Sequence, residues 1–113
     1  MSELNKLTAT EAAAGLAQGD FTATELMRAC LDRVAAREGD VQAWQHIDPD
    51  QALAAAKASD VARATGGDLG PLHGLPVGIK DIIDTADMPT ENGSALFEGR
   101  RPNADAGCVA ALR

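Results

Sequence analysis

One four-residue pattern, Thr-x-x-Glu, occurs twice near the start of the chain and constrains the fold more than any other feature. The two copies are Thr8–Glu11 and Thr22–Glu25. In this pattern the threonine and glutamate side chains satisfy each other's exposed backbone N–H groups, and a helix begins there. The sequence therefore predicts one helix over residues 8–18 and a second over residues 22–38.

The second predicted helix has one apolar face. Its apolar side chains recur at helical spacing, at Leu26, Met27, Cys30, Leu31 and Val34. Glycine favours helix ends, so we expect Gly39 to end this helix. Asp48 followed by Pro49 is typical of a helix start, because the carboxylate caps free N–H groups and proline fits the first turn. A third helix is thus predicted over residues 49–65, with a buried stripe at Leu53, Ala54, Val61 and Ala64.

Two apolar stretches predict β-strands. Residues 41–47 alternate between two faces, as half-buried strands do. Residues 75–80 form a short apolar run bounded by turn-forming residues, which is typical of a strand buried on both faces. The chain from 84 to 104 is rich in turn residues and predicts loops. Residues 105–113 predict an incomplete helix without the usual end pattern, which we interpret as a truncation.

Composition argues against several classes of function. Of the 113 residues 45% are hydrophobic, which suits one folded domain, but aromatic residues are only 3%. Apolar burial stabilises by roughly 25 cal/mol per Å², so a core of small side chains favours packing against further protein. The net charge of −7, without a basic patch, argues against direct binding of nucleic acid. The sequence has neither a membrane-length apolar run nor a signal peptide, so we expect a cytoplasmic protein.

A longer motif lies between residues 70 and 94. It consists of Gly70-Pro71-Leu72-His73-Gly74-Leu75-Pro76-Val77-Gly78-Ile79-Lys80-Asp81, then Asp84-Thr85, Met88-Pro89-Thr90 and Gly93-Ser94. In this order the residues closely resemble the amidase-signature family, at its lysine-bearing strand and the loop that follows. Asp105-Ala106, Val109 and Leu112-Arg113 resemble the family's next helix, and the chain before residue 66 fits its N-terminal region loosely.

The resemblance implies an α/β fold, in which residues 1–113 are the truncated N-terminal part of an amidase domain, a mixed sheet flanked by helices. It also implies a Ser–cis-Ser–Lys triad. In that triad the lysine takes a proton from one serine, which activates a second serine for attack on an amide carbonyl. The acyl-enzyme then releases ammonia or an amine. Lys80 matches the lysine. Both serines lie downstream of this chain in the family, and no metal or organic cofactor is implied.

Other side chains are weaker candidates for catalysis. A lysine at the end of an apolar run is usually a solvated strand end, so the motif rather than the spacing carries the assignment of Lys80. We expect a structural role for Asp81. Ser94 lacks the Gly-x-Ser-x-Gly context of a nucleophile and is expected in a turn. His46 and His73 have no convincing partner that would make them general bases.

Three functions are compatible with these features. The first is an amidase that hydrolyses a small-molecule amide in the complete protein, while this segment supplies only Lys80 and is inactive alone. The second is the amide-transferring member of a tRNA-dependent amidotransferase, its A subunit, although residues 84–91 look more like the stand-alone amidases. The third is a non-catalytic interaction module. The identity of the amide, and whether the protein forms a homo-oligomer, stay open.

Overall fold

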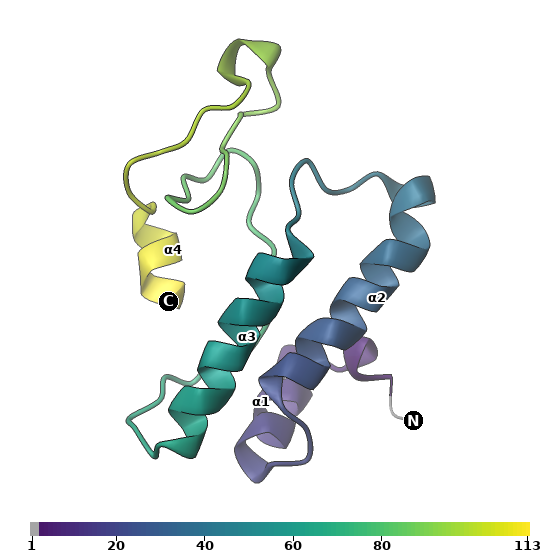
Figure 1. Cartoon of the computed structure of the whole chain (residues 1–113), viewed down its shortest axis with the longest axis vertical. Coiled ribbons are helices and arrows are strands. Elements are labelled where there is room, and N and C mark those ends of the chain that lie inside the picture. The colour runs from purple at the N-terminus through teal and green to yellow at the C-terminus, as the bar shows by residue number, and fades with distance from the viewer. Residues whose placement is uncertain (1–2) are drawn as a thin grey trace. The chain divides into compact units, whose positions relative to one another are not determined.

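The computed structural model describes residues 3–113. The chain divides into two compact units: a helical unit, Met1–Pro76, and a loop unit, Val77–Arg113. The helical unit contains η1 (Leu4–Lys6), α1 (Ala9–Gln18), α2 (Ala23–Val41) and α3 (Pro49–Ala64). α2 and α3 lie side by side and run antiparallel (Figure 1). No helix of the described residues combines the length and the apolar character needed to span a bilayer.

The core of the helical unit is built from small side chains. Its buried members are Ala12, Leu16, Ala23, Leu26 and Ala56. Partly buried apolar residues pack against them: Leu4, Leu7, Phe21, Met27, Cys30 and Leu75. Most of the buried members are alanine, so the helices approach each other closely but bury little apolar area per residue.

Both Thr-x-x-Glu patterns form the predicted capping boxes. At α1, Thr8 Oγ1 accepts from Glu11 N (3.2 Å) and the Glu11 carboxylate accepts from Thr8 N (2.8 Å). The backbone and side-chain hydrogen bonds from Thr8 lower the pKa of Glu11. At α2, Thr22 and Glu25 make the same two bonds, at 3.0 and 2.8 Å. The first two predicted helices therefore begin where the sequence places them.

A carboxylate from α3 completes the cap of α2. Asp60 Oδ1 accepts from Ala23 N (2.7 Å), and Asp60 Oδ2 accepts from Thr24 N (3.0 Å) and Thr24 Oγ1 (2.6 Å). These N–H groups belong to the first turn of α2 and have no partner inside the helix. Burial alone would raise the pKa of Asp60, but the hydrogen bonds from Thr24 and Ala23, helped by the charge of Arg63, lower the pKa. Asp60 thus ties the start of α2 to α3.

The strand predicted over residues 41–47 is wrong. α2 continues past Gly39, and Gln42 closes it in the left-handed conformation, with φ of 52°. The Glu38 carboxylate then accepts from the backbone N–H groups of residues 43–44, both at 2.8 Å. Backbone N–H groups that a strand would share with a neighbour are therefore already paired.

α3 begins as predicted but buries a different face. Asp48 accepts from a backbone N–H of the first turn (3.1 Å), and Pro49 stands at the start of the helix. Three members of the predicted stripe are wrong: Ala54 and Ala64 are exposed and Val61 is 63% exposed, whereas Ala56 is buried. Alanine occurs on every side of this helix, so hydrophobic periodicity could not select the face that packs.

Two glycines are required by close packing in the helical unit. A Cβ on Gly15, within α1, would overlap the ring of Phe21. Gly74 has φ of 85°, and a Cβ there would lie 3.2 Å from Leu16 Cδ1 and 3.3 Å from Ala23 Cβ. Gly15 lowers the helix propensity of α1, and its place in the sequence is explained by the aromatic ring that packs on it.

The loop unit contains η2 (Ala95–Phe97) and α4 (Gly107–Leu112), which irregular segments join (Figure 1). The helix expected over residues 105–113 is therefore present but shorter. The strand predicted over residues 75–80 is wrong, because this stretch has no regular secondary structure. A strand needs a neighbour that takes its backbone hydrogen bonds, and no other segment within residues 3–113 pairs with it in that way.

The predicted α/β class is accordingly wrong for the described chain. Residues 3–113 contain helices and no strand, so the mixed sheet is absent from them. The prediction rested on the family resemblance and on two apolar runs. Neither of these identifies a partner strand, and without one an apolar run remains irregular or joins a helix.

Candidate active-site segment

Lys80 lies near the start of the loop unit, at its first turn. The Lys80 carbonyl accepts from Ile83 N (3.0 Å), which closes that turn. The residue is exposed, and within residues 3–113 its ammonium group makes no hydrogen bond or ion pair. The described part of the chain therefore presents the Lys80 side chain to solvent, while a hydrogen bond holds its backbone.

Asp81, the next residue, holds a second turn of the chain. Its Oδ1 accepts from Glu91 N (2.9 Å) and its Oδ2 from Gly93 N (3.3 Å). The Asp81 carbonyl accepts from Asn92 N (2.9 Å), so three successive N–H groups donate to one residue. Asn92 and Gly93 are both left-handed, with φ of 56° and 66°, and Ser94 N donates to the Glu91 carbonyl (3.1 Å). This arrangement agrees with the structural role expected for Asp81.

A bidentate ion pair joins the two ends of the loop that follows. Arg100 Nη1 lies 2.9 Å from Asp84 Oδ1, and Arg100 Nη2 lies 3.3 Å from Asp84 Oδ2. Thr90 N donates to the Arg100 carbonyl (2.9 Å), and Arg100 Nη1 donates to the Thr90 carbonyl (3.3 Å). The hydrogen bonds from the guanidinium lower the pKa of Asp84, and the carboxylate raises the pKa of Arg100.

Two buried threonines occupy the interior of the same segment. Thr85 is 3% exposed and Thr90 is 1% exposed. Thr90 Oγ1 accepts from Thr85 N (3.3 Å) and donates to the Ile83 carbonyl (3.5 Å), while Thr85 Oγ1 donates to the Met88 carbonyl (3.4 Å). Among the described residues no buried side-chain nitrogen or oxygen lacks a partner. The interior of this loop is therefore ordered by hydrogen bonds as well as by apolar packing.

α4 is anchored to the same loop by Asp105. Its Oδ1 accepts from Ala86 N (2.8 Å), and its Oδ2 accepts from Arg113 Nε (2.8 Å). Arg113 Nη2 also pairs with Asp87 Oδ2 at 2.9 Å. Burial alone would lower the pKa of Arg113, but the charges of Asp87 and Asp105 raise the pKa. The ion pairs of Arg100 with Asp84 and of Arg113 with Asp87 were not predicted, because partners that far apart in sequence leave no periodic pattern.

The other sequence candidates have structural contacts. Ser94 Oγ accepts from Leu96 N (3.2 Å) and caps η2, which fits the turn expected there. In the helical unit, His73 Nε2 lies 2.8 Å from the Ser59 carbonyl. His46 is half-buried. The described residues contain no group of three His, Cys, Asp or Glu side chains that could hold a metal ion.

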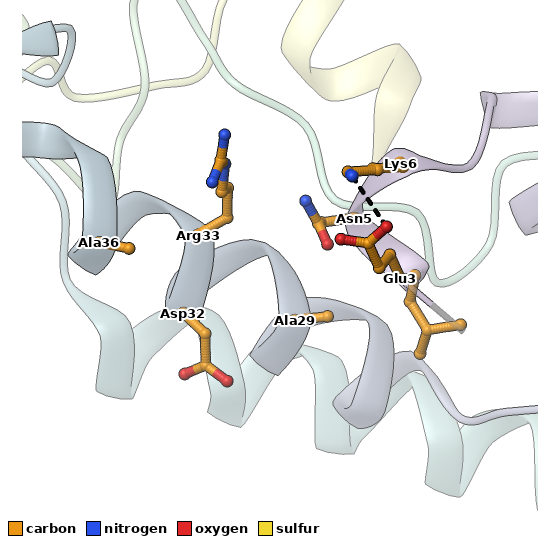
Figure 2. Close-up of a pocket in the computed structure, with 8 residues that line it drawn as sticks. Glu3, Asn5, Lys6, Ala29, Asp32, Arg33 and Ala36 are labelled. Carbon is orange, nitrogen blue, oxygen red and sulfur yellow. Dashed lines mark hydrogen bonds and ion pairs between the residues drawn. The ribbon is translucent and has the colours of Figure 1, made fainter. Parts of the chain in front are cut away.

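A surface depression lies in the helical unit between η1 and α2. It has a volume of about 310 Å³ and is lined by Glu3, Leu4, Asn5, Lys6, Ala29, Asp32, Arg33 and Ala36. Figure 2 shows an ion pair at its edge between Lys6 and Glu3, at 2.8 Å. Both side chains of that pair are more than half exposed, at 61% and 65%. No residue of the lysine motif lines this depression, so it gives no support to a substrate site.

Comparison with known proteins identifies the relatives of this segment. A family model described as Amidase matches residues 25–113. The A subunit of the glutamyl-tRNA(Gln) amidotransferase of Chloroflexus aurantiacus is 49% identical over 112 residues, and the protein of the same name from Thermobifida fusca is 44% identical over 113 residues. These alignments cover 99% and 100% of this chain but 23% of each relative.

A solved structure also matches this segment of chain. It is an inhibitor-bound complex described as an unexpected vestigial protein complex that reveals the evolutionary origins of an s-triazine catabolic enzyme. One of its chains superposes with a TM-score of 0.87 at 32% sequence identity, over 94% of this chain and 23% of that chain. The chain thus spans about a quarter of the length of the relatives it matches.

Proposed function

Because the chain belongs to the Amidase family, we propose that residues 1–113 are the N-terminal part of an amidase domain whose complete form breaks a carboxylic amide bond. The observation that carries this proposal is the family match over residues 25–113, which includes the whole lysine-bearing motif. The bond belongs to a small-molecule amide.

Lys80 is the proposed proton-relay residue. In its neutral form it takes a proton from one serine, and that serine takes the proton of a second serine as its oxygen attacks the amide carbonyl. The tetrahedral intermediate collapses to an acyl-enzyme, and the departing nitrogen receives the proton and leaves as ammonia or an amine. Water then hydrolyses the ester. The side chain of Lys80 makes no hydrogen bond or ion pair within residues 3–113, and its turn is held by a backbone hydrogen bond, so the ammonium group is open to a partner from outside this segment.

The serines of this mechanism come from sequence outside residues 1–113. Ser94, the tempting internal candidate, caps η2 through its oxygen and makes no hydrogen bond to Lys80. On this proposal the 113-residue chain is inactive alone, because it has a base without a nucleophile.

A second candidate is amide transfer. The observation that favours it is the 49% identity to the A subunit of a glutamyl-tRNA(Gln) amidotransferase. In that case the same serine and lysine chemistry would release ammonia from an amide donor for use on glutamyl-tRNA(Gln), with partner subunits. The lysine segment is common to both candidates, so it does not separate them.

The test uses the complete product of the gene that contains this chain. Purified protein is assayed for ammonia release from a panel of primary carboxamides that includes glutamine, and is treated with a fluorophosphonate that labels active serines. We expect ammonia release and one labelled serine, with neither in the 113-residue chain. Serine-dependent turnover by the 113 residues alone would contradict the proposal, as would a complete product that releases no ammonia. Copurifying subunits, and conversion of glutamyl-tRNA(Gln), would decide for transfer over hydrolysis.

A further inference from the structure

The residue that follows Lys80 is held more firmly than any other part of its turn. Asp81 receives three hydrogen bonds, two on its carboxylate and one on its carbonyl, from the consecutive N–H groups of residues 91–93. Hydrogen bonds to a charged acceptor are stronger than those between neutral groups. The backbone of Asp81 is therefore fixed to a segment ten or more residues away in sequence.

The turn that Asp81 contacts contains two adjacent left-handed residues. Asn92 is left-handed at φ of 56° and the next residue, Gly93, is left-handed at 66°. Asparagine and glycine adopt this region more readily than other residues, and the Ser94 N–Glu91 O hydrogen bond closes the turn at 3.1 Å. Asp81 accepts three of its N–H groups and so ties residues 91–93 to the turn that contains Lys80.

Hydrogen bonds hold the backbone both at Lys80 and at the next residue, Asp81. Its own carbonyl accepts from Ile83 N at 3.0 Å, and its Cα is about 3.8 Å from that of Asp81 across one peptide bond. Within residues 3–113 the Lys80 ammonium group makes no hydrogen bond or ion pair. Hydrogen bonds therefore hold the backbone at the Lys80 carbonyl and at the following residue, Asp81.

We propose that Asp81 is the positioning residue for Lys80: it anchors the lysine turn to residues 91–93 and leaves the ammonium group free for the serine relay. The inference rests on the proposed function, because it assigns Lys80 the relay role. Asp81 does not contact the reacting atoms in this proposal and acts only through the placement of Lys80.

The first test examines the contacts themselves in the complete gene product. Amide hydrogen exchange measured by NMR is expected to speed up at residues 91–93 in Asp81→Ala, and at only part of this set in Asp81→Asn, which keeps one acceptor oxygen. Asp105→Asn is the matched control, since Asp105 also accepts a backbone N–H, from Ala86 at 2.8 Å. It should leave residues 91–93 unchanged. Unchanged exchange at residues 91–93 in Asp81→Ala would overturn the proposal.

The second test is a double-mutant cycle in the complete gene product. Asp81→Ala should lower kcat by about 10- to 100-fold with little change in KM, because displacing a catalytic group by about 1 Å costs up to that factor. In the Lys80→Ala background the same change should alter kcat less than about twofold, since groups that act as one unit are not additive. Circular dichroism at the assay temperature checks that each variant is folded, and Asp81→Asn, with an intermediate kcat, replaces Asp81→Ala if the latter unfolds.

The outcomes separate the positioning role of Asp81 from the proposed function, in which Lys80 is the relay residue. If Asp81→Ala lowers kcat by the same factor with and without Lys80, Asp81 acts through general stability and the positioning role is overturned. If Lys80→Ala retains full activity, the proposed function fails and the positioning role fails with it, while the exchange result still reports whether Asp81 holds residues 91–93.

Discussion

Replacing Asp60 by alanine removes the contact that joins α3 to the start of α2. The carboxylate accepts from Ala23 N, Thr24 N and Thr24 Oγ1 at 2.6–3.0 Å. Ala23 is 2% exposed, so its N–H group would lose its partner in a place that water reaches poorly.

The size of the effect follows from these contacts. A helix cap contributes about 0.5–2 kcal/mol, and a buried donor left without a partner costs about 1–3 kcal/mol. The Asp60 carboxylate is partly solvated, which screens its charge and favours the lower part of each range. We expect Asp60→Ala to lower the free energy of unfolding by about 1.5–2 kcal/mol and Asp60→Asn by about half as much, since the amide keeps one acceptor oxygen.

Urea unfolding of the 113-residue chain, followed by circular dichroism at 222 nm, measures this loss. Asp68→Asn is the control, because Asp68 is exposed and carries the same charge in the same unit. Folding lowers the pKa of Asp60 below its unfolded value of about 3.9. Its stabilisation is therefore complete above that pH and disappears as the pH falls through the folded pKa. The difference between wild type and Asp60→Asn should shrink over that range.

A loss below about 0.5 kcal/mol in Asp60→Ala would refute this reasoning, because it would mean that water replaces the carboxylate at the start of α2. A difference between wild type and Asp60→Asn that grows as the pH falls below about 4 would equally contradict the sign of the pKa shift.

Three further results are expected. Gly74→Ala should destabilise the chain by about 1–3 kcal/mol in the same urea assay, because its φ of 85° and the nearby Leu16 and Ala23 side chains oppose a Cβ. Gly67 has open space around it, so Gly67→Ala should leave the free energy of unfolding unchanged. Arg100→Lys removes a bidentate pair with Asp84 and should speed amide exchange at Thr90; unchanged exchange there would show that the pair does not hold the loop. Burial raises the pKa of Cys30 while Cys108 is exposed, so a disulfide reagent at about pH 8, close to the pKa of a free thiol, should modify Cys108 first, and Cys108→Ser should abolish the fast phase.

Local patterns predicted the helices well because their determinants lie within a few residues. Thr8 with Glu11 and Thr22 with Glu25 form boxes at three-residue spacing, and Asp48 caps its own helix in the same way. The end of α2 was missed, since Gln42 rather than Gly39 takes the left-handed position. The Glu38 carboxylate accepts from the backbone N–H groups of residues 43–44, so these residues turn and do not form a strand. That contact is specific to this turn.

Long-range contacts could not be predicted from one sequence. Asp60 caps a helix that begins 37 residues earlier, and Arg100 pairs with Asp84 over 16 residues. The strand over residues 75–80 failed for the same reason, because an apolar run does not reveal whether a partner strand exists. The lysine motif itself was recognisable, since it depends on residue order. Its anchoring by Asp81 became visible only when residues 91–93 were placed beside it.

The most direct test of the central claim is the effect of Lys80→Ala on amide turnover by the complete gene product. We predict that kcat/KM for the best carboxamide falls by about 10²–10⁴-fold, the range for loss of a positioned acid or base, while Lys57→Ala, at an exposed lysine on α3, stays within about twofold of wild type. Retention of more than about a tenth of wild-type kcat/KM by a folded Lys80→Ala protein would contradict the assignment of Lys80 as the relay base.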